Sequence, residues 1–308
     1  MNIVILSSHT GWQTDELCRA LQERGHTGCV LAYEGLLSRL GKGTGQLSSA
    51  RTSILDADAV LARIIPTGSL EQIIYRVDSL HWVEERGVPV MNSPRAIERC
   101  VDKFYTTALL QEAGLPVPET VVCESAADAL AALGAMGDAI VKPIFGSLGH
   151  GMVRITDPDV ALRVVEPLEQ ISSVFYVQRT VDHGGRDIRV FVVGGRVIGA
   201  IERTAPSGEW RTNFSRGASV MPFDLPAAWE QMALAAAAAV GADYAGVDLL
   251  PSRDGQVFVL EVNGIPGWKG LQQATGTDVA GAIVEHLIAR VRARDVARDL
   301  TTKVELPA

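Results

Sequence analysis

The stretches Gly246-Val247-Asp248-Leu249-Leu250 and Leu260-Glu261-Val262-Asn263-Gly264 decide how this chain is interpreted. Each is a short, mainly apolar run that carries one carboxylate. Turn-forming residues fill the gap at 251–255, and this pattern is typical of an antiparallel β-hairpin. Opposed side chains on one face of a hairpin lie about 4.5–5.5 Å apart. Asp248 and Glu261 are therefore expected to lie side by side.

The side-chain amide of Asn263 falls on the same face as Glu261, so the hairpin would present three hard oxygen ligands. Mg²⁺ prefers such ligands and is often held by a few protein oxygens together with substrate phosphates. A single carboxylate on a strand is more often a solvated residue of the outer face. The magnesium interpretation therefore depends on a phosphate site elsewhere in the chain.

The composition is that of a soluble globular protein, with 47% hydrophobic and 21% charged residues in a chain of 308. The net charge of −8 argues against nucleic acid as a partner, because phosphate backbones bind basic surfaces. No apolar run approaches the roughly 20 residues of a membrane span. The four cysteines form no CxxC pair, which predicts reduced thiols and a cytoplasmic location.

Residues 1–93 are predicted to form a small α/β unit. A strand at 3–6, an amphipathic helix at 15–24 and a strand at 27–32 imply parallel strands joined by a right-handed crossover. Such sheets bind ligands beyond the carboxyl ends of their strands. Arg63 falls at such an end, so it is a candidate substrate-binding residue, with a polar loop residue as the alternative.

The segment 35–43 resembles a phosphate-binding P-loop but does not fit the pattern. Five residues follow its first glycine where four are needed, and Gly43 stands where a Mg²⁺-binding Ser or Thr must be. We therefore expect a flexible surface loop.

A second glycine-rich segment, at 145–151, follows a predicted strand at 139–143 that carries Lys142. Its glycines let backbone N–H groups curl around phosphate oxygens. A lysine in a partly apolar strand needs an anionic partner, so the pair favours phosphate binding. Lys103, on a predicted helix at 94–113, would by itself be a solvated residue.

Polar residues gather in the loop after a predicted strand at 197–202. In an acidic protein, arginines so placed suggest anionic ligands held by bidentate contacts, although a solvated loop is the alternative. The loop residues are Arg203, Arg211, Asn213 and Arg216.

Further on, we predict a last helix at 278–292 and a frayed, charged tail at 293–308.

Jointly these segments resemble the ATP-grasp superfamily and, within it, the RimK-like amino-acid ligases. The resemblance implies a mixed α/β (α+β) ATP-grasp fold with an N-terminal Rossmann-like parallel-sheet domain. It also implies an ATP-dependent carboxylate–amine ligase, in which ATP phosphorylates a carboxylate, an amine attacks the acyl phosphate and phosphate leaves. The segments that carry it are Asp102-Lys103, Ile140-Val141-Lys142, Gly146–Gly151, Val177-Gln178, Asp187-Ile188-Arg189, Ile201-Glu202-Arg203, Arg211-Thr212-Asn213, Arg216-Gly217, Ala245–Asp248, Glu261-Val262-Asn263 and Pro266-Gly267.

The resemblance assigns expected roles by position. The lysines and the glycine-rich hairpin would hold the ATP phosphates, the segment from Gln178 would bind adenine, and Asp187 would take the ribose. The hairpin oxygens would bind Mg²⁺, usually two ions, with Mn²⁺ as a substitute, and Arg216 would hold an amino-acid carboxylate. The nucleotide-binding residues so expected are Lys103, Lys142, Gly146, Ser147, Gly149, Gly151, Gln178, Arg179, Val181 and Asp187. The catalytic residues are Arg203, Arg211 and Asn213, and the metal ligands are Asp248, Glu261 and Asn263.

Two departures concern the substrates. The family usually has an acidic residue after Gln178, where this chain has Arg179. The segment 266–271 is more similar to the subgroup associated with methanopterin-type cofactors, in which glutamate or a similar amino acid is added to a pterin. Trp268 would then stack on the pterin ring, or else anchor the core or a lid.

We therefore expect a ligase that adds an L-amino acid such as glutamate to a small molecule of the tetrahydromethanopterin type or to a peptide. A D-alanine-type dipeptide ligase and a non-catalytic ATP-binding regulatory protein are the alternatives. The amino acid and its acceptor would be the partners, without nucleic acid or membrane, and we expect a homo-oligomer. The expected domains are a pre-ATP-grasp unit at 1–93, a linker helix and small lobe at 94–180, a metal-binding lobe at 181–292 and the tail.

Overall fold

The computed structural model describes the whole chain except residues 42, 44, 147–149, 213–216 and 305–308. Its first unit is a parallel four-stranded sheet in the order β2-β1-β6-β7. The predicted strand at 27–32 is confirmed, and the helix begins earlier than expected because Gly11 and Thr14 close its first turn. The elements are β1 (Asn2–Ser7), α1 (Trp12–Glu23), β2 (Thr27–Ala32), β6 (Ala59–Ala62), α2 (Leu70–Glu85) and β7 (Val90–Met91).

The segment expected to be a flexible loop belongs largely to a small antiparallel sheet, so that prediction is wrong for its described residues. After the turn η1 (Tyr33–Gly35), strand β3 pairs with β4, and β4 pairs with β5. Leu47 is buried in the core beside the parallel sheet, which fixes this excursion to the unit. The strands are β3 (Leu37–Arg39), β4 (Gln46–Ser49) and β5 (Thr52–Ser53).

The connecting helix predicted at 94–113 is two helices, α3 (Pro94–Val101) and α4 (Lys103–Glu112). Asp102 separates them in an extended conformation, and its Oδ1 accepts a hydrogen bond from the Tyr105 backbone N–H at 2.9 Å. A short acidic side chain at this position satisfies a free N–H of the first turn. The break places Lys103 at the start of α4.

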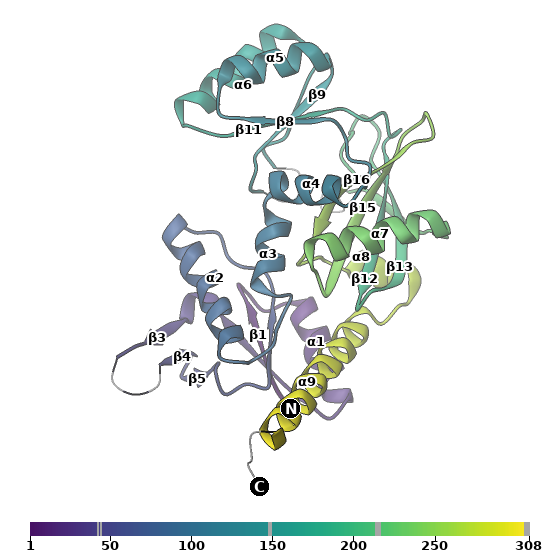
Figure 1. Ribbon diagram of the computed structural model, residues 1–308. Coiled ribbons are helices and arrows are strands. Elements are labelled where there is room, and N and C mark those ends of the chain that lie inside the picture. Colours follow the sequence, from purple (N-terminus) through teal and green to yellow (C-terminus); the bar gives the residue numbers. More distant parts are fainter. Residues whose placement is uncertain (42, 44, 147–149, 213–216, 305–308) are drawn as a thin grey trace.

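The second sheet is antiparallel, in the order β10-β9-β11-β8, with α5 and α6 packed against it. Figure 1 shows this small lobe at the opposite end of the molecule from the parallel sheet, with α3 and α4 between them. Its elements are β8 (Thr120–Cys123), α5 (Ala126–Met136), β9 (Ala139–Lys142), β10 (Val153–Ile155), α6 (Pro158–Gln170) and β11 (Phe175–Arg179).

The third sheet is antiparallel, in the order β14-β13-β12-β15-β16. Alanines of α7 (Ala227–Val240) pack closely on its apolar face, against Val190 and Val247 among others. The opposite face carries polar side chains along part of its length, while Phe191 and Ile201 on it pack in the core with Trp268. The strands are β12 (Arg186–Val193), β13 (Arg196–Thr204), β14 (Ser219–Pro222), β15 (Tyr244–Pro251) and β16 (Val257–Asn263).

The helices α8 (Lys269–Thr275) and α9 (Val279–Val304) complete the fold, and α9 corrects the expected end of the last helix. It runs back along α1 and buries Ile283 and Leu287 in one core with Leu17 (Figure 1). The Arg294 side chain, placed in the tail by the sequence pattern, donates hydrogen bonds to the backbone of the first unit. No helix in the described part of the chain is long and apolar enough to cross a bilayer.

Candidate functional site

A cleft of about 1820 Å³ lies between the small lobe, α3–α4 and the polar face of the third sheet. It gathers most of the residues that the sequence pattern singled out. Gly151 and Arg63 do not line it, and Ser147, Gly149, Asn213 and Arg216 lie outside the described residues. The expected site residues that line it are Lys103, Lys142, Gly146, Gln178, Arg179, Val181, Asp187, Arg203, Arg211, Asp248, Glu261 and Asn263.

Lys142 is buried at the end of β9, on the small-lobe side of the cleft. Its Nζ donates to Gln178 Oε1 at 2.6 Å, and the Gln178 amide in turn bonds Thr120 and the Tyr176 hydroxyl. Burial lowers the pKa of Lys142 to about 8, against the pull of Glu261 and with the repulsion of Lys103. The side chain that accepts the hydrogen bond of Lys142, Gln178, is neutral, so the amine can still pair with an anionic ligand.

Lys103 holds the start of the glycine-rich segment. Its Nζ donates to the backbone carbonyls of Ile144 at 3.2 Å and Gly146 at 2.9 Å. Burial lowers its pKa, while the charge of Glu261 opposes that shift. Two lysines therefore face the cleft from separate elements, α4 and β9, on the side opposite the carboxylates.

The predicted hairpin is confirmed: β15 pairs with β16 in antiparallel fashion, and Asp248 stands directly opposite Glu261. Asn263 Nδ2 donates to Glu261 Oε1 at 2.8 Å, so the amide lies beside the carboxylates as expected. Burial raises the pKa of Glu261, and the negative charge of Asp248 adds to that shift. Negative charge is therefore crowded at this point of the cleft.

Asp248 is held by two guanidinium groups. Arg189 bonds both carboxylate oxygens of Asp248, and Arg203 Nη2 lies 2.8 Å from Oδ2. Burial alone would raise the pKa of Asp248, but the two cations outweigh it and hold that pKa far below its usual range. The carboxylate is thus ionised and fixed in position.

Arg189 is a residue of the cleft to which the sequence assigned no role. It stands two residues after Asp187 on β12, on the same face, and its backbone pairs with that of Asp248. The alternation along β12 was a visible signal. The neighbour of β12 was not visible, because pairing between distant strands is a property of the whole sheet.

Asp187 lines the cleft, yet its carboxylate is turned into the protein. Its two oxygens accept from Arg203 Nε and Nη2, both at 2.6 Å, and one also accepts from the Thr212 hydroxyl. The side chain is 2% exposed. This arrangement does not support the ribose contact expected of Asp187, and it makes the residue a clamp that orients Arg203.

The donor set suits Mg²⁺ only in part, because both oxygens of Asp248, an expected ligand, already bond guanidinium groups. Glu261 and Asn263 offer oxygens to the cleft, and the nearest guanidinium nitrogen, of Arg189, is 3.7 Å from Glu261 Oε1. Among the described residues, no group of three His, Cys, Asp or Glu side chains is arranged to hold a metal ion. A magnesium ion here would need phosphate oxygens to complete its shell, which is how this ion is commonly bound beside nucleotides.

Arg211 also lines the cleft, with its guanidinium held in a fork by Glu209. Nε and Nη2 each lie 2.9 Å from a carboxylate oxygen of Glu209. These hydrogen bonds lower the pKa of Glu209 to about 2. Arg211 therefore has a carboxylate partner of its own, which the sequence pattern did not indicate.

The packing contradicts the expected pterin contact of Trp268, whereas the role of Arg179 in nucleotide binding stays a prediction. Trp268 is completely buried in the core, and Arg63 covers its ring at 4.7 Å, so it anchors the core and is not free to stack on a pterin. Arg179 turns away from the end of β11 to bond Glu119 Oε2 at 2.6 Å and the Met136 carbonyl. Its side chain therefore ties the lobe together.

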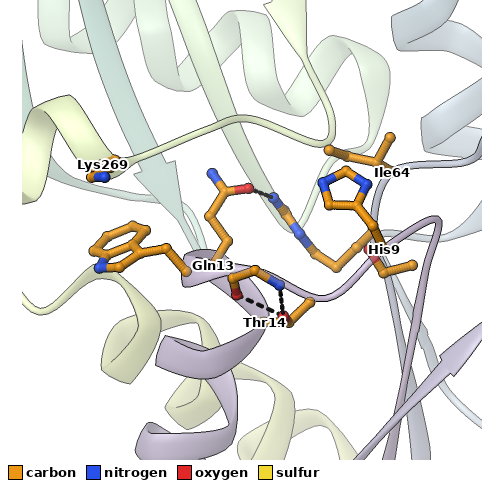
Figure 2. Close-up of a pocket in the computed structure, with 9 residues that line it drawn as sticks. His9, Gln13, Thr14, Ile64 and Lys269 are labelled. Atoms are coloured by element: carbon orange, nitrogen blue, oxygen red, sulfur yellow. Dashed lines mark hydrogen bonds between the residues drawn. The ribbon is translucent and has the colours of Figure 1, made fainter.

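Arg63 instead lies at a smaller pocket of about 230 Å³ beside the main cleft. The pocket lies beyond the carboxyl ends of β1 and β6, where parallel sheets bind ligands. Figure 2 shows His9 and Ile64 at one side of it, Lys269 at the other and Gln13 between them. The position predicted for Arg63 relative to the sheet is thus confirmed, and its role as a substrate contact stays a prediction.

Comparison with known families matches residues 1–97 to the RimK PreATP-grasp domain and residues 100–287 to the RimK-like ATP-grasp domain. The tetrahydromethanopterin:alpha-L-glutamate ligase of Methanosarcina acetivorans is 34% identical over 92% of this chain and 97% of its own. A probable alpha-L-glutamate ligase of Trichodesmium erythraeum is also 34% identical, over 93% of this chain and 96% of its own.

Among solved structures, the ATP-grasp ligase PsnB complexed with its minimal precursor superposes with a TM-score of 0.75 at 24% identity. That match covers 93% of this chain and 98% of the PsnB chain. The RimK domain protein from Sphaerobacter thermophilus superposes with a TM-score of 0.73 at 22% identity, over 93% and 99%. These likenesses confirm the ATP-grasp fold with its N-terminal parallel sheet.

The two family matches run through both the parallel-sheet unit and the lobes that enclose the cleft. Lysines on one side and the carboxylates of Asp248 and Glu261 on the other agree with a site that handles phosphates. The chain belongs to the RimK-like ATP-grasp family and is an ATP-dependent ligase that forms carbon–nitrogen bonds.

Proposed function

We propose that this ligase uses ATP and Mg²⁺ to join L-glutamate to an acceptor carboxylate, with a small molecule of the tetrahydromethanopterin type as the first candidate acceptor. The single observation that carries the cleft assignment is Lys142 and Lys103 facing the Asp248–Glu261 pair across one cleft. The amino acid and the acceptor are suggested by the names of relatives that are 34% identical along nearly their whole length.

The reaction balances as two transfers. A carboxylate oxygen of the acceptor attacks the γ-phosphorus of ATP, the bond from that phosphorus to the bridging oxygen breaks, ADP leaves, and the acceptor becomes an acyl phosphate. The amine nitrogen of glutamate then attacks the acyl carbon, the carbon–oxygen bond to phosphate breaks, and the amine loses a proton. Bound Mg²⁺ would neutralise charge on the transferring phosphoryl group.

The side chains of this cleft would act mainly by position and charge. Lys142 and Lys103 would hold the phosphates, and Arg203 would face the transferring group from a fixed orientation set by Asp187 and Asp248. Fixed cations stabilise developing negative charge without having to reorganise. Glu261 and Asn263 would hold the metal ion.

The test is a mass-spectrometric screen for products that form only when ATP, Mg²⁺, an amino acid and an acceptor are all present. Candidate acceptors are pterins with a carboxylate side chain and short peptides, and candidate donors are glutamate, alanine and aspartate. We expect a glutamyl adduct with one ADP released for each bond. A product with D-alanine alone would instead indicate a dipeptide ligase, and silence across the panel would remove the proposal.

A single substitution separates the metal assignment from the fold. Glu261→Gln keeps the shape of the side chain and removes the charge that would bind Mg²⁺, so we expect ADP release to fall at least 100-fold, as in other losses of transition-state charge stabilisation. Glu124→Gln, at an exposed position of the small lobe away from the cleft, is the matched control. Normal turnover in the Glu261 variant would overturn the metal assignment.

A further inference from the structure

Arg63 is a buried cation whose described partners are all neutral. Its side chain is 2% exposed, and its guanidinium donates to Tyr244 Oη, Gln13 Oε1 and the Pro266 carbonyl, each at 3.1 Å. No ion pair between described residues involves it at 4.0 Å or less. A buried charge without a counter-ion is costly, and the cost falls when an anion binds beside it.

The pocket beside Arg63 has the electrostatics of an anion site. Its lining contains two cations, Arg63 and Lys269, and not one carboxylate, in a chain with a net charge of −8. The first turn of α1 also borders it, and a helix start adds partial positive charge. Lys269 is exposed and lies 5.8 Å from the Trp12 ring, within reach of a ligand in the pocket.

The pocket is too small for a nucleotide or a pterin. Its volume of about 230 Å³ lies below the roughly 300–1,000 Å³ of pockets that hold drug-sized ligands. Gln13, Ile64 and Lys269 line both this pocket and the main cleft, so the two spaces adjoin. A ligand in the cleft can therefore place one small group in the pocket.

We propose that this pocket binds a carboxylate that does not react, carried by one of the ligase substrates. The proposal rests on the proposed function. The carboxylate would pair with Arg63 and Lys269, while Gln13 positions the guanidinium (Figure 2). It belongs either to the incoming glutamate or to an acceptor that ends in a glutamyl group, and both sources offer the same chemistry.

Direct binding separates the two sources without any turnover. Calorimetric titrations of the protein with ADP and Mg²⁺ present use L-glutamate as one probe and folate, a pterin that ends in a glutamyl group, as the other. We expect Lys269→Met to lower the affinity for one of the two probes by about tenfold, because one charge-assisted contact is lost. Lys269→Arg should restore most of that loss.

Two further variants sharpen the result. Gln13→Glu would place a carboxylate against Arg63, so it should weaken the same probe as Lys269→Met without lowering the melting temperature. Arg196→Met, on an exposed hairpin away from both cavities, removes the same charge from the protein and should change neither affinity.

If the Lys269 and Gln13 variants bind both probes with unchanged affinity, the proposal that this pocket binds a carboxylate is wrong, even if the ligase is active. Conversely, an inactive chain that still loses affinity in both variants would keep the pocket and refute only the proposed reaction. Failure of the two proposals is therefore distinguishable.

Discussion

Asp248 is buried between two guanidinium groups, so removing one of them leaves its charge only partly balanced. We expect Arg189→Met to lower the free energy of unfolding by about 3 kcal/mol, the usual cost of breaking a buried ion pair from one side. Urea denaturation followed by circular dichroism measures it. The loss should also raise the pKa of Asp248, because Arg189 is one of the two cations that lower it.

Arg186→Met is the matched control on the same strand. Arg186 is half exposed and pairs with Glu202 at 3.2 Å, and such surface pairs contribute about 0–1 kcal/mol. Equal destabilisation by the two variants would show that the buried Arg189–Asp248 pair contributes no more to stability than the surface pair of Arg186.

The buried amine of Lys142 predicts a pH dependence of nucleotide binding. With a pKa of about 8, Lys142 is charged at pH 7 in the free protein and mostly neutral at pH 9. Phosphate binding favours the charged form, so affinity for ADP with Mg²⁺ should fall as pH rises through 8, by at most about tenfold at pH 9.

Fluorescence titration with a labelled ADP at pH 6.5–9.5 tests this dependence. Lys142→Arg keeps the positive charge throughout the range and should bind with a flatter profile. An equally steep decline in the arginine variant would assign the titration to another group, and Lys103 is the first candidate because burial lowers its pKa too.

Single residues were predictable from the sequence where local rules decide them. Alternation and the hairpin turn placed Asp248 near Glu261, but they do not fix the register. Near the turn Leu249 pairs with Val259, and a one-residue shift between Asp248 and Leu249 brings Glu261, in place of Leu260, opposite Asp248. The partners of Asp187, Arg189 and Arg203 could not be predicted, since they depend on β12 lying between β13 and β15. The sequence could thus name many charged residues of the cleft, though not Arg189 or Glu209, and it could not show which charges neutralise each other.

Among the elements, the break between α3 and α4 has a functional consequence. Asp102 caps α4, and Lys103 at its first position bonds two carbonyls of the glycine-rich segment. Asp102→Ala should cost about 1 kcal/mol of stability and also weaken ADP binding several-fold, because the start of α4 frays and Lys103 loses its fixed position.

Asp157→Ala provides the comparison. Asp157 caps α6, on the far side of the small lobe from the cleft, through bonds to the N–H groups of Asp159 and Val160. It should lose similar stability in a thermal melt and keep its affinity for ADP. If both variants kept their affinity for ADP, the α4 cap would have no role in nucleotide binding.

Elements with strong periodic patterns were predicted well, whereas those made by tertiary contacts were missed. The alanine-rich segment at 227–240 is helical throughout, because its composition favours a helix in any context. The three strands at 37–53 and the strand at 219–222 are short, and they are strands because neighbours supply hydrogen-bond partners. The extension of α9 beyond residue 292 likewise depends on Arg294 reaching the first unit.

At the scale of the whole molecule, the parallel-sheet unit and the β15–β16 hairpin are joined into one body. Asn92, at the end of β7, is completely buried and donates to the carbonyls of Tyr244 at 2.7 Å and Gly264 at 2.5 Å. Its Oδ1 accepts from the N–H groups of Asp243 and Tyr244. The outer ends of both hairpin strands are therefore held by Asn92, which lies 152 residues before Tyr244 in the chain.

This junction predicts that the first unit and the third sheet unfold together. Asn92→Ala removes four hydrogen bonds, three of them buried, at about 1–3 kcal/mol for each buried group left unsatisfied. Because relaxation recovers part of this, we expect a loss of about 4 kcal/mol. Urea unfolding followed by tryptophan fluorescence and by hydrogen exchange should then show the first unit unfolding separately. The control is Asn2→Ala, at an exposed side chain of the same sheet, which should leave one joint transition. A single cooperative transition of unchanged midpoint in the Asn92 variant would mean that other contacts hold the two parts together, among them the packing of α1 on α9 and the hydrogen bonds of Arg63.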